Sequence, residues 1–82
     1  MNYLKQVDKL ISILTDNDEA AAAESIILLK ENSFTSSELL LSVTHKLLSL
    51  VSENKNIKNL IYNEVIELKN YCSSIGLEVT EL

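Results

Sequence analysis

The chain has 82 residues, a net charge of −5 and seven basic residues, all of them lysine. This length allows one small domain, and an acidic balance without arginine disfavours direct binding of nucleic acid, because phosphate recognition favours the bidentate arginine side chain. Hydrophobic residues make up 46% of the sequence but aromatic ones only 5%, so we expect a packed core of Leu, Ile, Val and Ala rather than disorder.

Turn-forming residues are scarce, since the sequence has no proline and one glycine. This scarcity disfavours sheets and hairpins and favours an all-α fold. One cysteine forms no internal disulfide, no secretion signal is recognisable at the start, and no apolar run approaches the roughly 18 residues of a membrane span. We therefore expect a cytoplasmic protein that acts without a membrane.

An amphipathic first helix is predicted over about residues 3–15. Its apolar residues recur at alternating steps of three and four, with polar residues on the other face. A second helix is predicted over about residues 18–31, so Asp16, Asp18 and Glu19 lie where the positive end of its dipole is expected. Two interpretations stay open: the three carboxylates stabilise the start of the helix, or they form an acidic projection for a basic partner.

The start of a third helix, predicted over residues 36–53, is the most complete local signal in the sequence. Thr35 and Glu38 have the spacing of a capping box, in which the threonine hydroxyl accepts from the Glu38 N–H and the Glu38 carboxylate accepts from the Thr35 N–H. Phe34 and Leu39 are spaced to touch as a hydrophobic staple. We therefore expect this helix to begin sharply and to be the most buried of the set.

A fourth helix is predicted over about residues 57–75, either capped by Asn56 after a short polar connection or continuous with the third helix. Gly76 stands where a helix needs a left-handed residue after its end, and Leu77 is placed to fold back on Cys72. Cys72 falls on the apolar stripe, where a thiol acts as a small hydrophobic group, so we expect it to be chemically inert.

Four helices with short connections place sequence neighbours side by side in antiparallel order. We therefore predict an all-α fold in which residues 1–82 form a single domain, a compact antiparallel up-down four-helix bundle. A more irregular, orthogonal packing of the same helices stays open.

The sequence offers few side chains for catalysis or for a metal site. His45 is the single histidine, Cys72 is the single cysteine, and no Glu-x-x-His pair of a carboxylate-bridged metal site occurs. His45 can serve as a surface residue, a switch or a base, but no second histidine accompanies it. We expect no enzyme activity, no metal and no cofactor, which leaves recognition of another protein.

Recognition through a helical face usually depends on large amphipathic side chains at the edge of the apolar stripe. The predicted fourth helix offers two such edges. One consists of Tyr62, Ile66 and Lys69, and the other of Glu64, Glu67 and Tyr71. The second edge, with one tyrosine and two carboxylates, suits a basic protein partner. Alternatively, each tyrosine packs its ring on the bundle and leaves its hydroxyl in water.

The overall pattern resembles a known class of proteins. The chain is compact and acidic, opens with a Leu/Ile-rich amphipathic helix and closes with residues 67–77, Glu-Leu-Lys-Asn-Tyr-Cys-Ser-Ser-Ile-Gly-Leu. In these features it is similar to the small helical immunity proteins paired with EndoU-type nuclease toxins in contact-dependent inhibition. A looser similarity to the colicin nuclease immunity proteins lies in residues 35–38, 43–45 and 60–62. That family continues with a second tyrosine and a proline, where this sequence has Asn-Glu.

The resemblance implies a bacterial protein that binds a cognate toxin, a basic nuclease, and covers its active site without chemistry of its own. Acidic side chains are expected to take the place of substrate phosphates, and tyrosines to act as anchors. Charge and spacing select the residues expected to bind this partner: Asp16, Asp18, Glu19, Tyr62, Glu64, Glu67 and Tyr71. The competing hypothesis is a helical adaptor or a homodimeric assembly module without a toxin partner.

Overall fold

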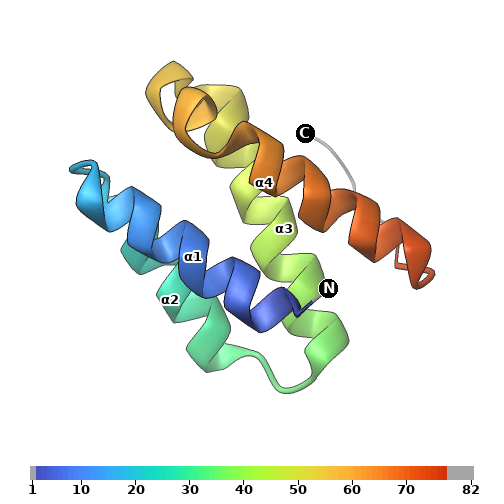
Figure 1. The fold of residues 1–82 in the computed structure, drawn as a ribbon. Helices are drawn as coiled ribbons and strands as arrows, with labels where there is room; N and C mark the ends of the chain where they lie inside the picture. The colour runs from blue at the N-terminus through green and yellow to red at the C-terminus, as the bar shows by residue number, and fades with distance from the viewer. Residues whose placement is uncertain (1, 78–82) are drawn as a thin grey trace.

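A computed structural model describes residues 2–77, and this part of the chain folds into four α-helices (Figure 1). Residue 1 and residues 78–82 of the predicted domain lie outside the described part. The helices are α1 (Tyr3–Asp16), α2 (Ala20–Asn32), α3 (Ser36–Glu53) and α4 (Lys55–Ser74). No strand occurs between residues 2 and 77, so the predicted all-α class is confirmed.

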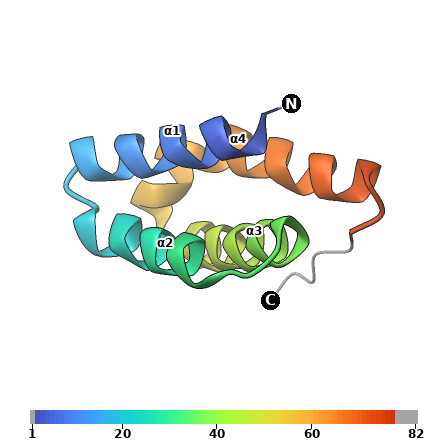
Figure 2. The same cartoon turned by 90° about the horizontal axis from the view of Figure 1, so that it is seen from below.

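The helices pack as a four-membered bundle in two layers, with α1 beside α4 in one layer and α2 beside α3 in the other (Figure 2). Each helix contacts its neighbours in sequence, and α4 also contacts α1. The chain direction alternates from one helix to the next, as an up-down bundle requires. Figure 1 shows that α3 runs obliquely to α4, so the axes are not all parallel.

One apolar core fills the space between the layers, in a molecule whose principal dimensions are 33 × 22 × 22 Å. Its side chains come from all four helices and recur at helical spacing. The buried residues are Val7, Leu10 and Leu14 of α1, Ala22, Ala23 and Ile26 of α2, Leu40, Val43, Thr44, Leu47, Leu48 and Val51 of α3, and Ile57, Ile61, Val65, Leu68 and Cys72 of α4. The third helix contributes the most buried side chains, as predicted.

The connection between α1 and α2 is short and includes one left-handed residue. Asp18 has a φ of 62°, a region that aspartate tolerates better than most residues. Because this backbone cannot continue into a helix, α2 begins at Ala20 instead of near residue 18 as predicted. The first helix extends one residue further than predicted, so Asp16 is its last residue.

The predicted start of α3 is confirmed in one part and wrong in another. The Glu38 N–H donates to the Thr35 hydroxyl at 3.1 Å, so Thr35 is the N-cap. Phe34, however, is 93% exposed and does not form the predicted staple with Leu39. The half-buried Ser33 donates its hydroxyl to the Leu29 carbonyl at 2.7 Å. Ser33 has an extended backbone after the end of α2 (φ −88°, ψ 137°), and the Phe34 ring that follows it lies in water.

A single residue separates α3 from α4, so the two helices are not continuous. Asn54 has an extended backbone, with φ −134° and ψ 110°. Its side-chain oxygen accepts from the N–H groups of Asn56 and Ile57, at 2.9 and 3.2 Å. Asn54 is therefore the N-cap, and the prediction that Asn56 has this role was wrong. The helix begins two residues earlier than predicted because the capping asparagine is itself two residues earlier.

The predicted end of α4 is confirmed within one residue. Gly76 has a φ of 83°, its N–H donates to the Ser73 carbonyl at 3.2 Å, and the Leu77 N–H donates to the Cys72 carbonyl at 2.8 Å. This pair of hydrogen bonds is the Schellman motif, which satisfies the last helical carbonyls. Leu77 packs against the core, so the end of the helix is fixed by backbone and side chain together.

Candidate protein-binding surface

The carboxylates between α1 and α2 do not act as helix caps. Glu19 is the N-cap residue of α2, but its side chain makes no capping hydrogen bond, and no acidic residue lies in the first turn of the helix. Asp16 and Asp18 are exposed. Asp18 and Glu19 still directly precede α2, where negative charge stabilises the positive end of the helix dipole. Both interpretations, stabilisation of the helix start and an acidic projection for a basic partner, therefore stay open.

The Glu19 side chain connects this turn to α4. Its carboxylate accepts from the Asn56 side-chain amide at 3.3 Å, across 37 positions of sequence. The turn and the start of α4 consequently lie at the same end of the molecule (Figures 1 and 2). Glu19, and with it the turn that also contains Asp18, is thus held beside the first turn of α4.

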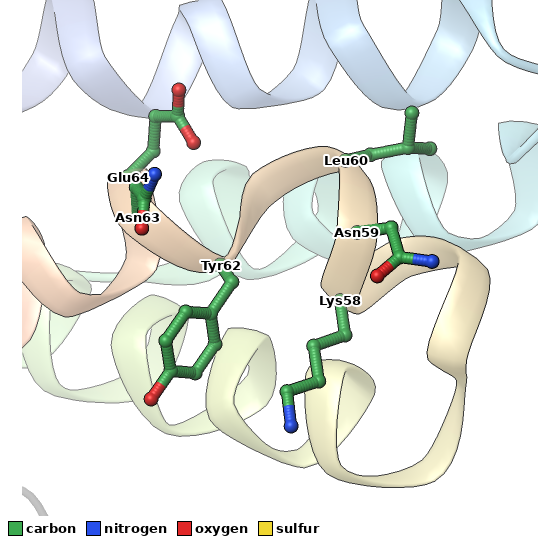
Figure 3. A pocket seen from close by; sticks show the side chains of 6 residues that line it. All are labelled: Lys58, Asn59, Leu60, Tyr62, Asn63 and Glu64. Atoms are coloured by element: carbon green, nitrogen blue, oxygen red, sulfur yellow. The ribbon is translucent and has the colours of Figure 1, made fainter.

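The two predicted edges of α4 lie on opposite sides of its buried stripe. Figure 3 shows the Glu64 side chain pointing toward α1 and the Tyr62 side chain pointing away from it. Glu64 is half-buried, Glu67 is exposed, and Tyr62 is 43% exposed. The Lys58 ammonium lies 5.3 Å from the centre of the Tyr62 ring, which is the geometry of a cation–π contact.

Tyr71 is packed against the rest of the bundle more extensively than Tyr62 is. Its ring stacks on that of Tyr3, with centroids 6.2 Å apart and planes at 24°, and both rings pack against the core. This contact joins the start of α1 to the second half of α4. The alternative in which a tyrosine packs its ring on the bundle therefore describes Tyr71 well.

The residues expected to bind a partner form two groups. At about 1.5 Å per residue, Tyr71 lies about 22 Å along α4 from Asn56. The first group combines the acidic turn (Asp16, Asp18 and Glu19) with Tyr62, and the second consists of Glu64, Glu67 and Tyr71, which follow one another along the other edge of α4. A partner that contacts both the acidic turn and Tyr71 has to cover most of the length of α4.

A hollow of about 320 Å³ lies on the outer surface of α4, in its first half. Figure 3 shows its lining, which comes entirely from one stretch of the helix. The lining residues are Lys58, Asn59, Leu60, Tyr62, Asn63 and Glu64. They supply one cation, one carboxylate, two amides and an aromatic ring, but no nucleophile. This chemistry suits the binding of a polar or charged side chain.

The remaining candidates for chemistry lie elsewhere. Cys72 is fully buried, and its sulfur lies 3.7 Å from the Thr44 hydroxyl, in the contact between α3 and α4. His45 is half-buried on α3. Among residues 2–77, no group of three or more His, Cys, Asp or Glu side chains is placed to hold a metal ion. Over the same residues, no helix combines the length and hydrophobicity that crossing a membrane takes.

Three surface features were not predicted from the sequence. The exposed ring of Phe34 was expected to be covered, and Leu28 on α2 is 51% exposed. The contact between Lys58 and Tyr62 was missed as well, although their spacing of four residues on a helix was the available signal. The polar residues on both sides of Phe34 were the only signal for its exposure.

Residues 2–77 define a small all-α four-helix bundle. Comparisons with protein-family models, with curated proteins and with solved structures find no match to this chain. The arguments that follow therefore rest on its own residues.

Proposed function

We propose that this chain is an immunity protein, which binds a basic nuclease toxin and neutralises it by covering its active site. The observation that carries the proposal is the hydrogen bond between Glu19 and Asn56, because it brings the acidic turn to the exposed first half of α4. The net charge of −5 supports the same choice of partner. Complementary potentials raise association rates by orders of magnitude and disfavour partners of the wrong charge.

In this proposal the chain does no chemistry of its own. Carboxylates of the acidic turn and of Glu64 and Glu67 occupy positions that substrate phosphates take in the nuclease. Tyr62 serves as an anchor, since partly exposed aromatic side chains supply much of the binding energy at interfaces. Because inhibition results from covering the active site of the nuclease, one immunity protein should inhibit one nuclease molecule.

The proposal is tested by recovering the partner and measuring its activity. The tagged protein is expressed in its own host, together with the product of the adjacent upstream gene, and the bound proteins are identified by mass spectrometry. We expect a basic nuclease that is released by salt and whose cleavage of nucleic acid stops at a one-to-one ratio. Recovery of a nuclease that stays fully active in the complex contradicts the proposal.

The alternative, a homodimeric assembly module, is favoured by one observation, the 93% exposure of Phe34. Covering a ring that is exposed to water in the monomer with a second copy of the chain stabilises the dimer. Sedimentation of the isolated chain over a range of concentrations distinguishes the two proposals. A concentration-dependent dimer that Phe34→Ser abolishes supports the assembly module, whereas a monomer throughout supports the occluding inhibitor.

A further inference from the structure

The hollow on α4 already holds a cation in the free protein. The Lys58 ammonium lies over the ring of Tyr62, 5.3 Å from its centre. Lys58 is exposed and Tyr62 is 43% exposed, so this contact lies at the surface and not in the core. A contact of this kind at an exposed site is weak, and another cation can replace it.

The other lining residues add acceptors for a cation. Asn59 and Asn63 each contribute a side-chain carbonyl. The Glu64 carboxylate points toward α1, away from the Tyr62 ring (Figure 3), so it does not contact a cation held on that ring. The volume of about 320 Å³ is at the small end of ligand sites, which span roughly 300 to 1,000 Å³. The hollow therefore has room for one long side chain and chemistry for a positive one.

We propose that this hollow binds an arginine side chain of the partner, whose guanidinium replaces the Lys58 ammonium on the ring of Tyr62. The proposal rests on the proposed function, since it specifies how a basic partner is recognised. A guanidinium is planar and more weakly hydrated than an ammonium, so it stacks better on an aromatic face. The chain contains no arginine of its own. Lys58 is therefore the residue of this chain that competes with the partner's arginine for the Tyr62 ring.

Lys58 then lowers the affinity of the site in two ways. It covers the aromatic face that the incoming guanidinium needs, and its positive charge repels that guanidinium. Removing the charge while keeping the length of the side chain, as in Lys58→Met, should therefore tighten binding. Replacing a lysine that lies far from the interface should change the affinity little. A gain in affinity at position 58 is therefore specific to this proposal.

The experiment uses the full chain and a short peptide with one arginine between glycines, followed by the amide signals in NMR spectra. We expect saturable shifts centred on residues 58–64, and none with a peptide in which citrulline replaces arginine. Lys58→Met should tighten binding by about two- to five-fold, the range of an exposed cation–π contact. Lys5→Met, which makes the same charge change on α1, should leave binding unchanged.

Substitutions of the ring give the second test. Tyr62→Phe keeps the aromatic face and should keep binding, whereas Tyr62→Leu should abolish it. Shifts spread over all acidic surfaces, equal effects of Lys58→Met and Lys5→Met, or full binding by Tyr62→Leu would each overturn the arginine site.

The titration needs no toxin, so its outcome is separate from that of the partner experiment. A specific arginine site in a chain that captures no nuclease leaves this inference standing and refutes the immunity proposal. A captured and inhibited nuclease whose affinity is unchanged by Lys58→Met and Tyr62→Leu supports the immunity proposal and refutes the arginine site.

Discussion

At the scale of single residues, Phe34 contributes little to folding, because 93% of its surface stays in water. We expect Phe34→Ala to change the free energy of unfolding by less than about 0.5 kcal/mol, as for other surface substitutions. Urea unfolding measures this change. The control is Leu40→Ala on the buried side of α3, which should cost about 2 to 5 kcal/mol. A loss of similar size at Phe34 would show that its ring is buried in solution.

Gln6 shows the reverse situation to Phe34, because it buries a polar group that has no hydrogen-bond partner. Its Nε2 atom is inaccessible to water and has no hydrogen-bond partner among the described residues. A buried donor without a partner lowers the free energy of unfolding by about 1 to 3 kcal/mol. Replacing Gln6 with a side chain of the same shape that lacks the donor should therefore leave the stability unchanged or raise it.

We therefore expect Gln6→Met to keep the free energy of unfolding or raise it by about 1 kcal/mol, as measured by thermal or urea unfolding. Gln6→Glu should lower it instead, because a carboxylate brings a charge into the same partly buried position. A clear loss of stability with methionine would mean that the Gln6 amide has a partner in solution.

At the scale of the elements, the boundary between α3 and α4 depends on Asn54. Its side chain accepts two N–H groups at the start of α4, and loss of such a cap typically costs about 1 kcal/mol. We expect Asn54→Ala to lower the free energy of unfolding by this amount.

Asn56→Ala is the matched control, since it removes an asparagine two positions away that makes only an exposed hydrogen bond to Glu19. Its cost should stay below about 0.5 kcal/mol. If both variants lose equal stability, Asn54 is not the cap in solution. The far-UV circular dichroism of both should stay helical, because the break between the helices is set by the backbone as well as by the side chain.

How far the sequence predicts the elements depends on whether each signal is local. The Thr35 cap and the Gly76 end depend on residues within one turn, and both were found where the pattern predicts them. The choice of Asn54 over Asn56 was missed because two asparagines within three residues offer equivalent caps, and only the path of the chain decides between them. Phe34 was misplaced for a related reason, since the path of the connection between α2 and α3, which no local pattern fixes, leaves its ring 93% exposed.

At the scale of the whole molecule, the candidate surface depends on contacts that no local pattern contains. The approach of Glu19 to Asn56 spans 37 positions, and the stacking of Tyr3 on Tyr71 joins the two ends of the described chain. The sequence predicted which charged residues of α4 lie outside its buried stripe, because helical spacing determines that. It did not predict which of them meet, because this requires the packing of α1 against α4.

Charge reversal distinguishes a localised surface from the effect of net charge alone. Glu64→Lys with Glu67→Lys changes the net charge as much as Glu24→Lys with Glu31→Lys does. The second pair lies on α2, on exposed positions. If α4 meets a basic partner, the first double variant should slow association with the recovered nuclease by about tenfold or more, whereas the second should have a much smaller effect.

The dependence on salt completes this test. At about 1 M salt the screening length falls to about 3 Å, so a long-range effect on the association rate should largely disappear while close contacts keep part of theirs. Thermal unfolding of both variants checks that the half-buried position of Glu64 tolerates lysine. Equal slowing by the two double variants would show that net charge, and not the α4 surface, steers the partner. An unchanged affinity of the α4 variant at low salt would remove Glu64 and Glu67 from the interface.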